Sequence, residues 1–174
     1  MKTSAALVLV LLALSAVPVP AEERAGLRVE IVPKIVENRS APTRSVNSVI
    51  SDVDKNMSLK ATVKNVSMKD MPEGSIDYVI LVHRWTGTEQ QSISQYTGKV
   101  ALPPLRTTEQ VEVDVGNYHI GGHRHGTSSR HEDKLVGWKL SITQGGVPVE
   151  FRTPTTFEEL NRKAKPSVAK PAPR

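Results

Sequence analysis

The 174-residue chain contains no cysteine, and this absence removes several classes of function at once. Disulfide bonds, which stabilise many small secreted domains, cannot form. Thiol catalysis, thiolate metal ligation and redox switching are excluded for the same reason, and so is a lipid anchor on a modified cysteine. Packing and hydrogen bonds alone must therefore hold the folded chain together.

The sequence also lacks a hydrophobic run long enough to cross a membrane. The apolar run Ala5–Ala16 is shorter than the roughly 20 residues that a transmembrane helix needs. Lys2 precedes this run, and small residues at Val19 and Ala21 precede Glu22. This order is typical of a secretory signal peptide. We therefore expect residues 1–21 to be removed and the mature chain to be secreted or periplasmic, without a membrane span.

The predicted domain has no excess of positive charge, although the whole chain carries 23 basic and 18 acidic residues. Lys2 lies in the predicted signal peptide, and five basic residues but no acidic ones follow Leu160. Residues 22–160 are thus left with 17 basic and 18 acidic residues. A nucleic-acid-binding domain usually carries a basic face. We therefore expect no binding of nucleic acid by this domain.

The C-terminal residues 165–174 are rich in proline, alanine and lysine. Such a composition buries too little apolar surface to order itself, which predicts a disordered basic tail. Attachment of the domain to anionic envelope polymers is one hypothesis for these charges. Before the tail, Thr156-Phe157-Glu158-Glu159 matches the capping-box pattern, which predicts a short helix within residues 154–164.

Most of the remaining sequence alternates apolar and polar residues with a period of two, as strands do. The segments LRVEI, MSLKATVKN and EQVEVDV follow this pattern, while IDYVILVHRW and LVGWKLSIT are nearly continuous β-branched or apolar runs typical of central strands. A tight hairpin is predicted from residues 135–143 to residues 147–152. A long polar connection is predicted over residues 37–56, with a short strand at residues 46–50 as an option. The sequence therefore predicts an all-β domain over residues 22–153, a single antiparallel immunoglobulin-like β-sandwich of seven to eight strands with a short C-terminal helix.

Two segments carry a resemblance to a known class of domains. LKATVKNVSMKD, followed by a central strand, and later ALPPLRTTEQVEVDV resemble the layout of bacterial immunoglobulin-like and fibronectin-III-like modules. The resemblance covers residues 27–152, although the usual Asn-x-Gly turn is here Asn65-Val66-Ser67. It implies an adhesive, scaffolding or accessory module without catalysis, and it transfers no functional residue to this chain.

Four of the five histidines lie in the segment HIGGHRHGTSSRH, which we expect to be a long loop between two strands. Imidazole groups suit zinc, copper and nickel where thiolates are absent. His119, His123, His125 and His131 are therefore candidate metal ligands, with Glu132 or Asp133 as a further donor. Because Arg124 and Arg130 interleave with these ligands and glycines surround them, a hydrated hairpin tip is the competing interpretation.

No catalytic constellation accompanies these histidines. The chain has no His-Glu-x-x-His and no Gly-x-Ser-x-Gly motif. The acid pair Asp52 and Asp54 is typical of a solvated surface, and Trp85 and Trp138 are expected in the core. The sequence thus favours an exported, non-enzymatic binding or structural accessory module whose partner is a protein or an envelope component. The alternative is an exported metal-binding protein, and no other cofactor is expected.

Overall fold

The structure is a computed structural model that describes residues 22–24, 26–45, 48–85, 92–125, 129–144, 146 and 148–166. Within these ranges the side chains of residues 22–24, 41–51 and 124–130 are not described. The predicted signal peptide, residues 1–21, and residues 167–174 of the predicted tail lie outside the described ranges.

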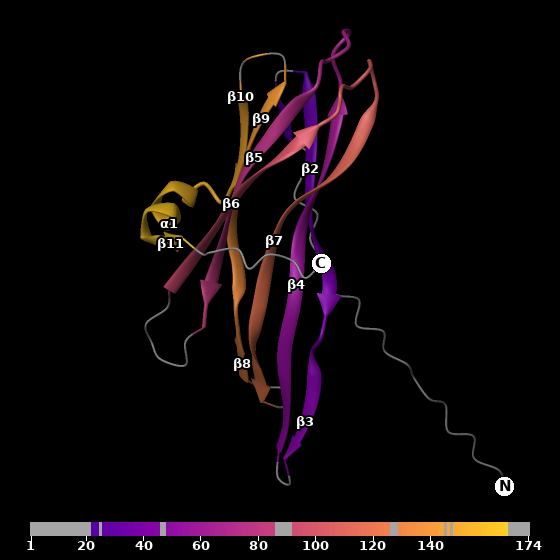
Figure 1. Cartoon of the computed structure of the whole chain (residues 1–174). Coiled ribbons are helices and arrows are strands. Elements are labelled where there is room, and N and C mark those ends of the chain that lie inside the picture. The colour runs from indigo at the N-terminus through magenta and orange to yellow at the C-terminus, as the bar shows by residue number, and fades with distance from the viewer. Residues whose placement is uncertain are drawn as a thin grey trace, which may run out of the picture.

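The described residues form two β-sheets and one short helix (Figure 1). This confirms the predicted all-β class, with eleven strands in the described residues in place of seven or eight. Sheet 1 has the order β1-β2-β4-β7-β8, with β3 paired to β4, and sheet 2 has the order β10-β9-β5-β6-β11. The strands of sheet 1 are β1 (Glu22–Arg24), β2 (Leu27–Asn38), β3 (Ala41–Ser45), β4 (Ser48–Asn65), β7 (Gln110–His125) and β8 (Ser129–Glu132). Those of sheet 2 are β5 (Gly74–Arg84), β6 (Ser92–Leu102), β9 (Lys134–Gln144), β10 (Pro148–Thr153) and β11 (Ala164–Pro166).

One hydrophobic core holds side chains from both sheets. Alternate residues of the sheet 1 strands face it, as their period of two predicts. The predicted central strand β5 lies in the middle of sheet 2, between β9 and β6, and the predicted tight hairpin is the pair β9 and β10. Fully buried members of the core are Leu59, Ala61, Val63, Ile76, Ile80, Val82, Val115, Leu140 and Ile142.

The predicted polar connection over residues 37–56 is wrong, although the strand expected at residues 46–50 is present in part as the start of β4. In its place β2 continues to Asn38, β3 covers Ala41–Ser45, and β4 begins at Ser48 and runs for 18 residues. β3 and the first residues of β4 form an antiparallel hairpin, with Ala41 opposite Asp52 and Ser45 opposite Ser48. At the open end of this hairpin, Asp52 is exposed whereas Val53 is buried, at 5% exposure.

A β-bulge at Gly116 interrupts the pairing of β4 with β7. Leu59 lies opposite Val115, whereas its neighbour Ser58 lies opposite Asn117, so Gly116 has no partner on β4. Gly116 has a φ of 63°, and a Cβ atom there would lie 2.5 Å from the ring of Tyr78. Both features favour glycine at this position. Because of the extra residue, odd-numbered residues of β7 face the core before the bulge and the opposite side of the sheet after it.

Sheet 1 is longer than sheet 2. In Figure 1, β3, β8 and the adjoining parts of β4 and β7 project beyond the ends of β5 and β6. We call β3, residues 48–56 of β4, residues 119–125 of β7 and β8 the extension. Asp133 is the single residue between the last strand of the extension, β8, and the strand β9 of sheet 2. The chain therefore passes from one sheet to the other at Asp133.

The predicted short helix is present as α1, Phe157–Lys163. The predicted capping box is wrong, because the side chain of Thr156 makes no capping hydrogen bond. Burial of Phe157 instead fixes the first turn of the helix. The predicted disorder from residue 165 is also wrong for Lys165 and Pro166, which belong to β11 and pair in parallel with β6.

Candidate functional site

The base of the extension is held by a buried carboxylate. Asp133 is 8% exposed, and its Oδ1 accepts a hydrogen bond from the backbone N–H of Trp85 at 2.9 Å. Its Oδ2 accepts one from the backbone N–H of Gly121 at 3.0 Å and also pairs with Arg84. The Arg84 guanidinium further donates to the carbonyl of His119 at 3.0 Å and to the hydroxyl of Tyr96. This network ties the end of β5 to the extension and fixes the backbone of Trp85.

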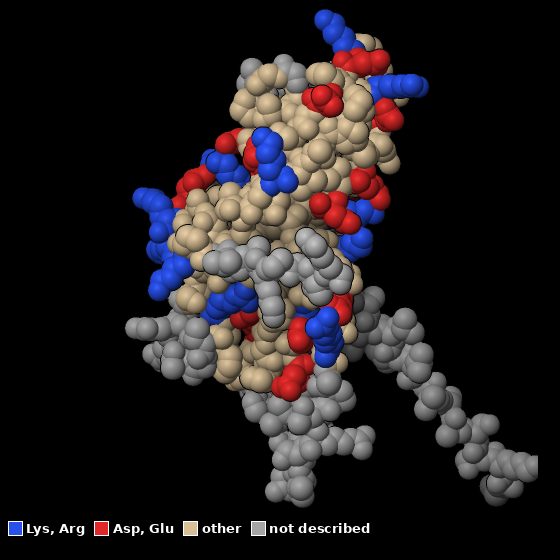
Figure 2. Space-filling model, in the orientation of Figure 1, with Lys and Arg blue, Asp and Glu red and all other residues tan. Residues whose placement is uncertain are grey.

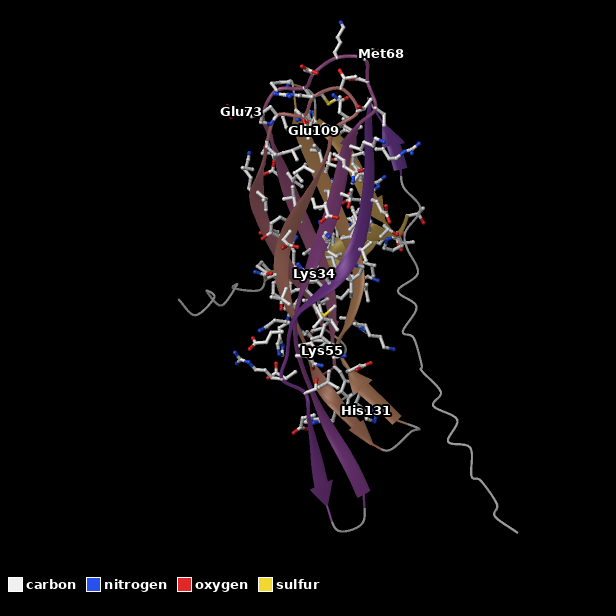
Figure 3. The ribbon with its side chains drawn as sticks, turned by 90° about the vertical axis from the view of Figure 1, so that its right-hand side faces the viewer. Lys34, Lys55, Met68, Glu73, Glu109 and His131 are labelled. Atoms are coloured by element: carbon white, nitrogen blue, oxygen red, sulfur yellow. The ribbon has the colours of Figure 1, made fainter. Side chains whose placement is uncertain are left out.

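Trp85 lies beside two of the histidines. The His131 ring centroid is 4.6 Å from the Trp85 ring at an interplanar angle of 32°, and the His123 ring is 6.4 Å away at 87°. Figure 3 shows His131 at the lower part of the molecule, far from Met68 at the other end. The prediction that both tryptophans lie in the core is correct for Trp138, which is 5% exposed, and wrong for Trp85, which is 38% exposed.

Two histidines of β7 are paired with two carboxylates of β4. His123 Nδ1 lies 2.7 Å from Asp52 Oδ1, and His119 Nε2 lies 3.0 Å from Asp54 Oδ1. All four side chains are about half exposed. Residues opposite one another on neighbouring strands share a face of the sheet. The register places Asp52, His123 and His131 directly opposite one another on β4, β7 and β8.

We call the surface formed by Trp85, Asp52, Asp54, His119, His123 and His131 the Trp85 face. Its residues of β4 and β7 lie on the side of sheet 1 opposite to Tyr118 and Ile120, which pack against the core. Burial of Tyr118 raises the pKa of its hydroxyl far above the usual value.

Glu37 borders the Trp85 face on β2. Asn56, directly opposite His119, donates a hydrogen bond to Glu37 Oε2 at 3.0 Å, and Arg39 Nε donates to Glu37 Oε1 at 2.7 Å. The hydrogen bond from Arg39, followed by that from Asn56, lowers the pKa of Glu37. This keeps the carboxylate charged and paired.

The prediction that the segment HIGGHRHGTSSRH forms a long loop is wrong, because most of this segment is strand. β7 continues through His125, and β8 begins at Ser129. Gly122 makes this pairing feasible, because a Cβ atom there would lie 2.3 Å from the carbonyl oxygen of His131 and its φ is 148°.

The structure brings three of the four predicted metal ligands onto one face: His119, His123 and His131. The backbone of His125 pairs with Ile50 and Ser129, and its side chain lies outside the described part. Among the described residues, no group of three His, Asp or Glu side chains is placed to hold a metal ion. His119 and His123 instead pair with separate carboxylates.

Sequence reasoning missed three contributors to this face: Trp85, Asp52 and Asp54. One signal for the two acids was present, because Asp52 and Asp54 are two residues apart and side chains at this spacing share a face of a strand. Nothing in the local sequence of Trp85 distinguished it from a core residue.

Comparisons with known proteins add little to this description. No family model and no curated protein matches the chain. A crystal structure of a protein from Akkermansia muciniphila is similar at a TM-score of 0.32 and 6% sequence identity, over 84% of each chain. Within the described residues, no helix is long and apolar enough to cross a membrane. On the side of the molecule shown in Figure 2, basic and acidic side chains are intermixed.

Proposed function

We propose that the chain is an exported, non-enzymatic binding module of immunoglobulin-like type, and that it binds a protein or an envelope component through the Trp85 face. The signal-peptide pattern of residues 1–21 supports export. The two sheets, antiparallel except for the parallel pair of β6 and β11, support the immunoglobulin-like type. The partly exposed ring of Trp85, beside imidazoles from β7 and β8, is the observation that carries the proposed binding surface.

The face is organised before any ligand arrives. The Asp133 network fixes the backbone of Trp85, and hydrogen bonds to Asp52 and Asp54 orient the rings of His123 and His119. A preorganised surface loses little side-chain entropy on binding, so more of the contact energy contributes to affinity. Partly exposed aromatic residues are also enriched among the residues that dominate binding energies.

Cosedimentation of the processed chain with insoluble envelope material tests this function. We expect Trp85→Ala to reduce the bound fraction about tenfold or more, as loss of a dominant interface residue does. Met68→Ala is the matched control, because Met68 is 93% exposed at the opposite end of the molecule. Equal binding by wild type and Trp85→Ala would exclude this face as the binding surface.

Metal binding is the second candidate function, and the register favours a particular set of ligands for it. Asp52, His123 and His131 form a row across three neighbouring strands. Carboxylate and imidazole groups suit zinc, copper and nickel. Binding would require the His131 ring to turn from Trp85 toward the row.

Calorimetry with each of the three metal ions tests the second candidate. Affinity that is lost in His123→Ala and His131→Ala but kept in His119→Ala supports the row as the site. A dissociation constant no tighter than about 100 µM for all three ions would exclude it.

A further inference from the structure

We propose that the ligand of the Trp85 face is a neutral oligosaccharide, with one sugar ring stacked on the indole of Trp85. This inference rests on the proposed function, since it assigns a chemical class to the ligand of the same face.

The indole is suited to a sugar ring because it is both exposed and rigid. Asp133 accepts a hydrogen bond from the backbone N–H of Trp85 at 2.9 Å, so the base of the side chain is fixed. The indole ring carries negative charge on its faces, which attracts the weakly positive C–H groups of a pyranose. The packing of His131 at 4.6 Å holds the ring in one orientation.

The groups around Trp85 match the hydroxyls of a sugar. Sugar hydroxyls both donate and accept hydrogen bonds. A carboxylate accepts up to about four hydrogen bonds, and a neutral imidazole donates at one nitrogen and accepts at the other. Asp52, Asp54, His119 and His123 thus supply both kinds of group, from half-exposed side chains on two adjacent strands.

The balance of charge favours a neutral ligand over an ionic one. Asp52 and Asp54 each pair with an imidazole, and Arg84 pairs with Asp133 at the base of the face. Glu37 at the border pairs with Arg39. Since these described charged groups already have partners, a polyanion gains little from them and a polycation must displace the imidazoles from Asp52 and Asp54.

The experiment is an NMR titration of the ¹⁵N-labelled, processed chain. The probes are cellotetraose, the tetramer of N-acetylglucosamine and a galactose tetraose, each at about 10 mM to populate weak complexes. The two tryptophans give two indole N–H signals. Trp138 is buried in the core and serves as the internal control. We expect at least one sugar to shift the Trp85 signal in a saturable manner while the Trp138 signal stays in place.

Variants separate stacking from folding. We expect Trp85→Ala to abolish the shifts of the surrounding backbone amides and Asp54→Asn to weaken binding about tenfold, whereas Trp85→Tyr restores part of the affinity and Met68→Ala changes nothing. An unchanged Trp138 signal verifies that each variant is folded. Identical sugar affinity in Trp85→Ala and wild type would overturn the proposal.

Two outcomes distinguish failure of this inference from failure of the proposed function. If no sugar shifts the Trp85 signal but cosedimentation still depends on Trp85, the ligand is not a neutral sugar and the binding surface stands. An octalysine peptide that shifts the signal in low salt, when the sugars do not, leads to the same conclusion. If cosedimentation is independent of Trp85, the proposed function fails with the inference.

Discussion

Replacement of Asp133 by alanine should destabilise the whole domain, because this residue joins the two sheets. The substitution removes a carboxylate that accepts hydrogen bonds from the backbone of Trp85 and of Gly121 and that pairs with Arg84. Removing one partner of a buried ion pair costs about 3–5 kcal/mol. Arg84 keeps its contacts with the His119 carbonyl and the Tyr96 hydroxyl, so we expect the lower end, about 3 kcal/mol.

Urea denaturation followed by circular dichroism measures this loss. With a slope of about 1–3 kcal/mol per molar urea, the midpoint should fall by about 1–3 M at an unchanged slope. Asp77→Ala is the matched control, because Asp77 forms an exposed pair with Lys99 at 3.6 Å. The control should cost less than about 1 kcal/mol.

The refuting result is a cost for Asp133→Ala no larger than that of the control. A double-mutant cycle with Arg84→Ala adds a second criterion. If Asp133 and Arg84 act as a pair, the summed losses of unfolding free energy in the two single variants should exceed the loss in the double variant by about 1 kcal/mol or more. Additive costs would mean that the backbone hydrogen bonds, and not the ion pair, account for the effect.

Three further predictions concern other parts of the molecule. Asn65→Ala should lower the free energy of unfolding by about 3 kcal/mol, measured by thermal or urea denaturation. The fully buried Asn65 side chain donates to the Lys69, Leu105 and Arg106 carbonyls and accepts from Ser67. A loss below about 1 kcal/mol would contradict this prediction. Gly122→Ala should abolish hydrogen-exchange protection in β8 while β5 stays protected, because a Cβ would lie 2.3 Å from the His131 carbonyl oxygen; unchanged exchange in β8 would contradict it. In an NMR titration the Glu37 carboxyl should have a higher pKa in Arg39→Ala than in the wild type, because the hydrogen bond from Arg39 lowers this pKa. The lowered pKa stabilises the fold at pH values above the pKa of Glu37 in the unfolded chain, and this stabilisation is lost as the pH falls. Equal pKa values in the two proteins would refute the role of Arg39.

The sequence predicted the parts of the fold that have a second layer. β5 and the hairpin of β9 with β10 were found because burial imposes an apolar pattern on their residues. The extension was missed because many of its described side chains are polar. Asp52, Asp54 and His119 are about half exposed, and the buried Val53 between the two acids is too short an apolar signal to mark a strand. Hydrogen bonds between backbones hold such a sheet together, and these leave no trace in side-chain composition.

The candidate site was only half predictable for a related reason. The sequence singled out His119, His123 and His131 by their density, but it could not pair them with Asp52 and Asp54, which lie about 70 residues away along the chain. It also placed Trp85 in the core, because the apolar run of β5 gives no sign that the second sheet ends there. The all-β class followed from local pattern, whereas the composition of the Trp85 face depended on strand register.

The bulge at Gly116 shifts by one residue the alternation of inward and outward side chains along β7. Before it, the strand presents Val113 and Val115 to the core; after it, the same odd-numbered positions carry His119 and His123 outward. If Gly116 took a regular place in the strand instead of bulging, the half before it would be unchanged and the two faces of the half after it would be exchanged, turning the imidazoles inward and Tyr118 outward. A single glycine thus sets which alternate side chains of the outer half of β7 pack into the core and which point away from it.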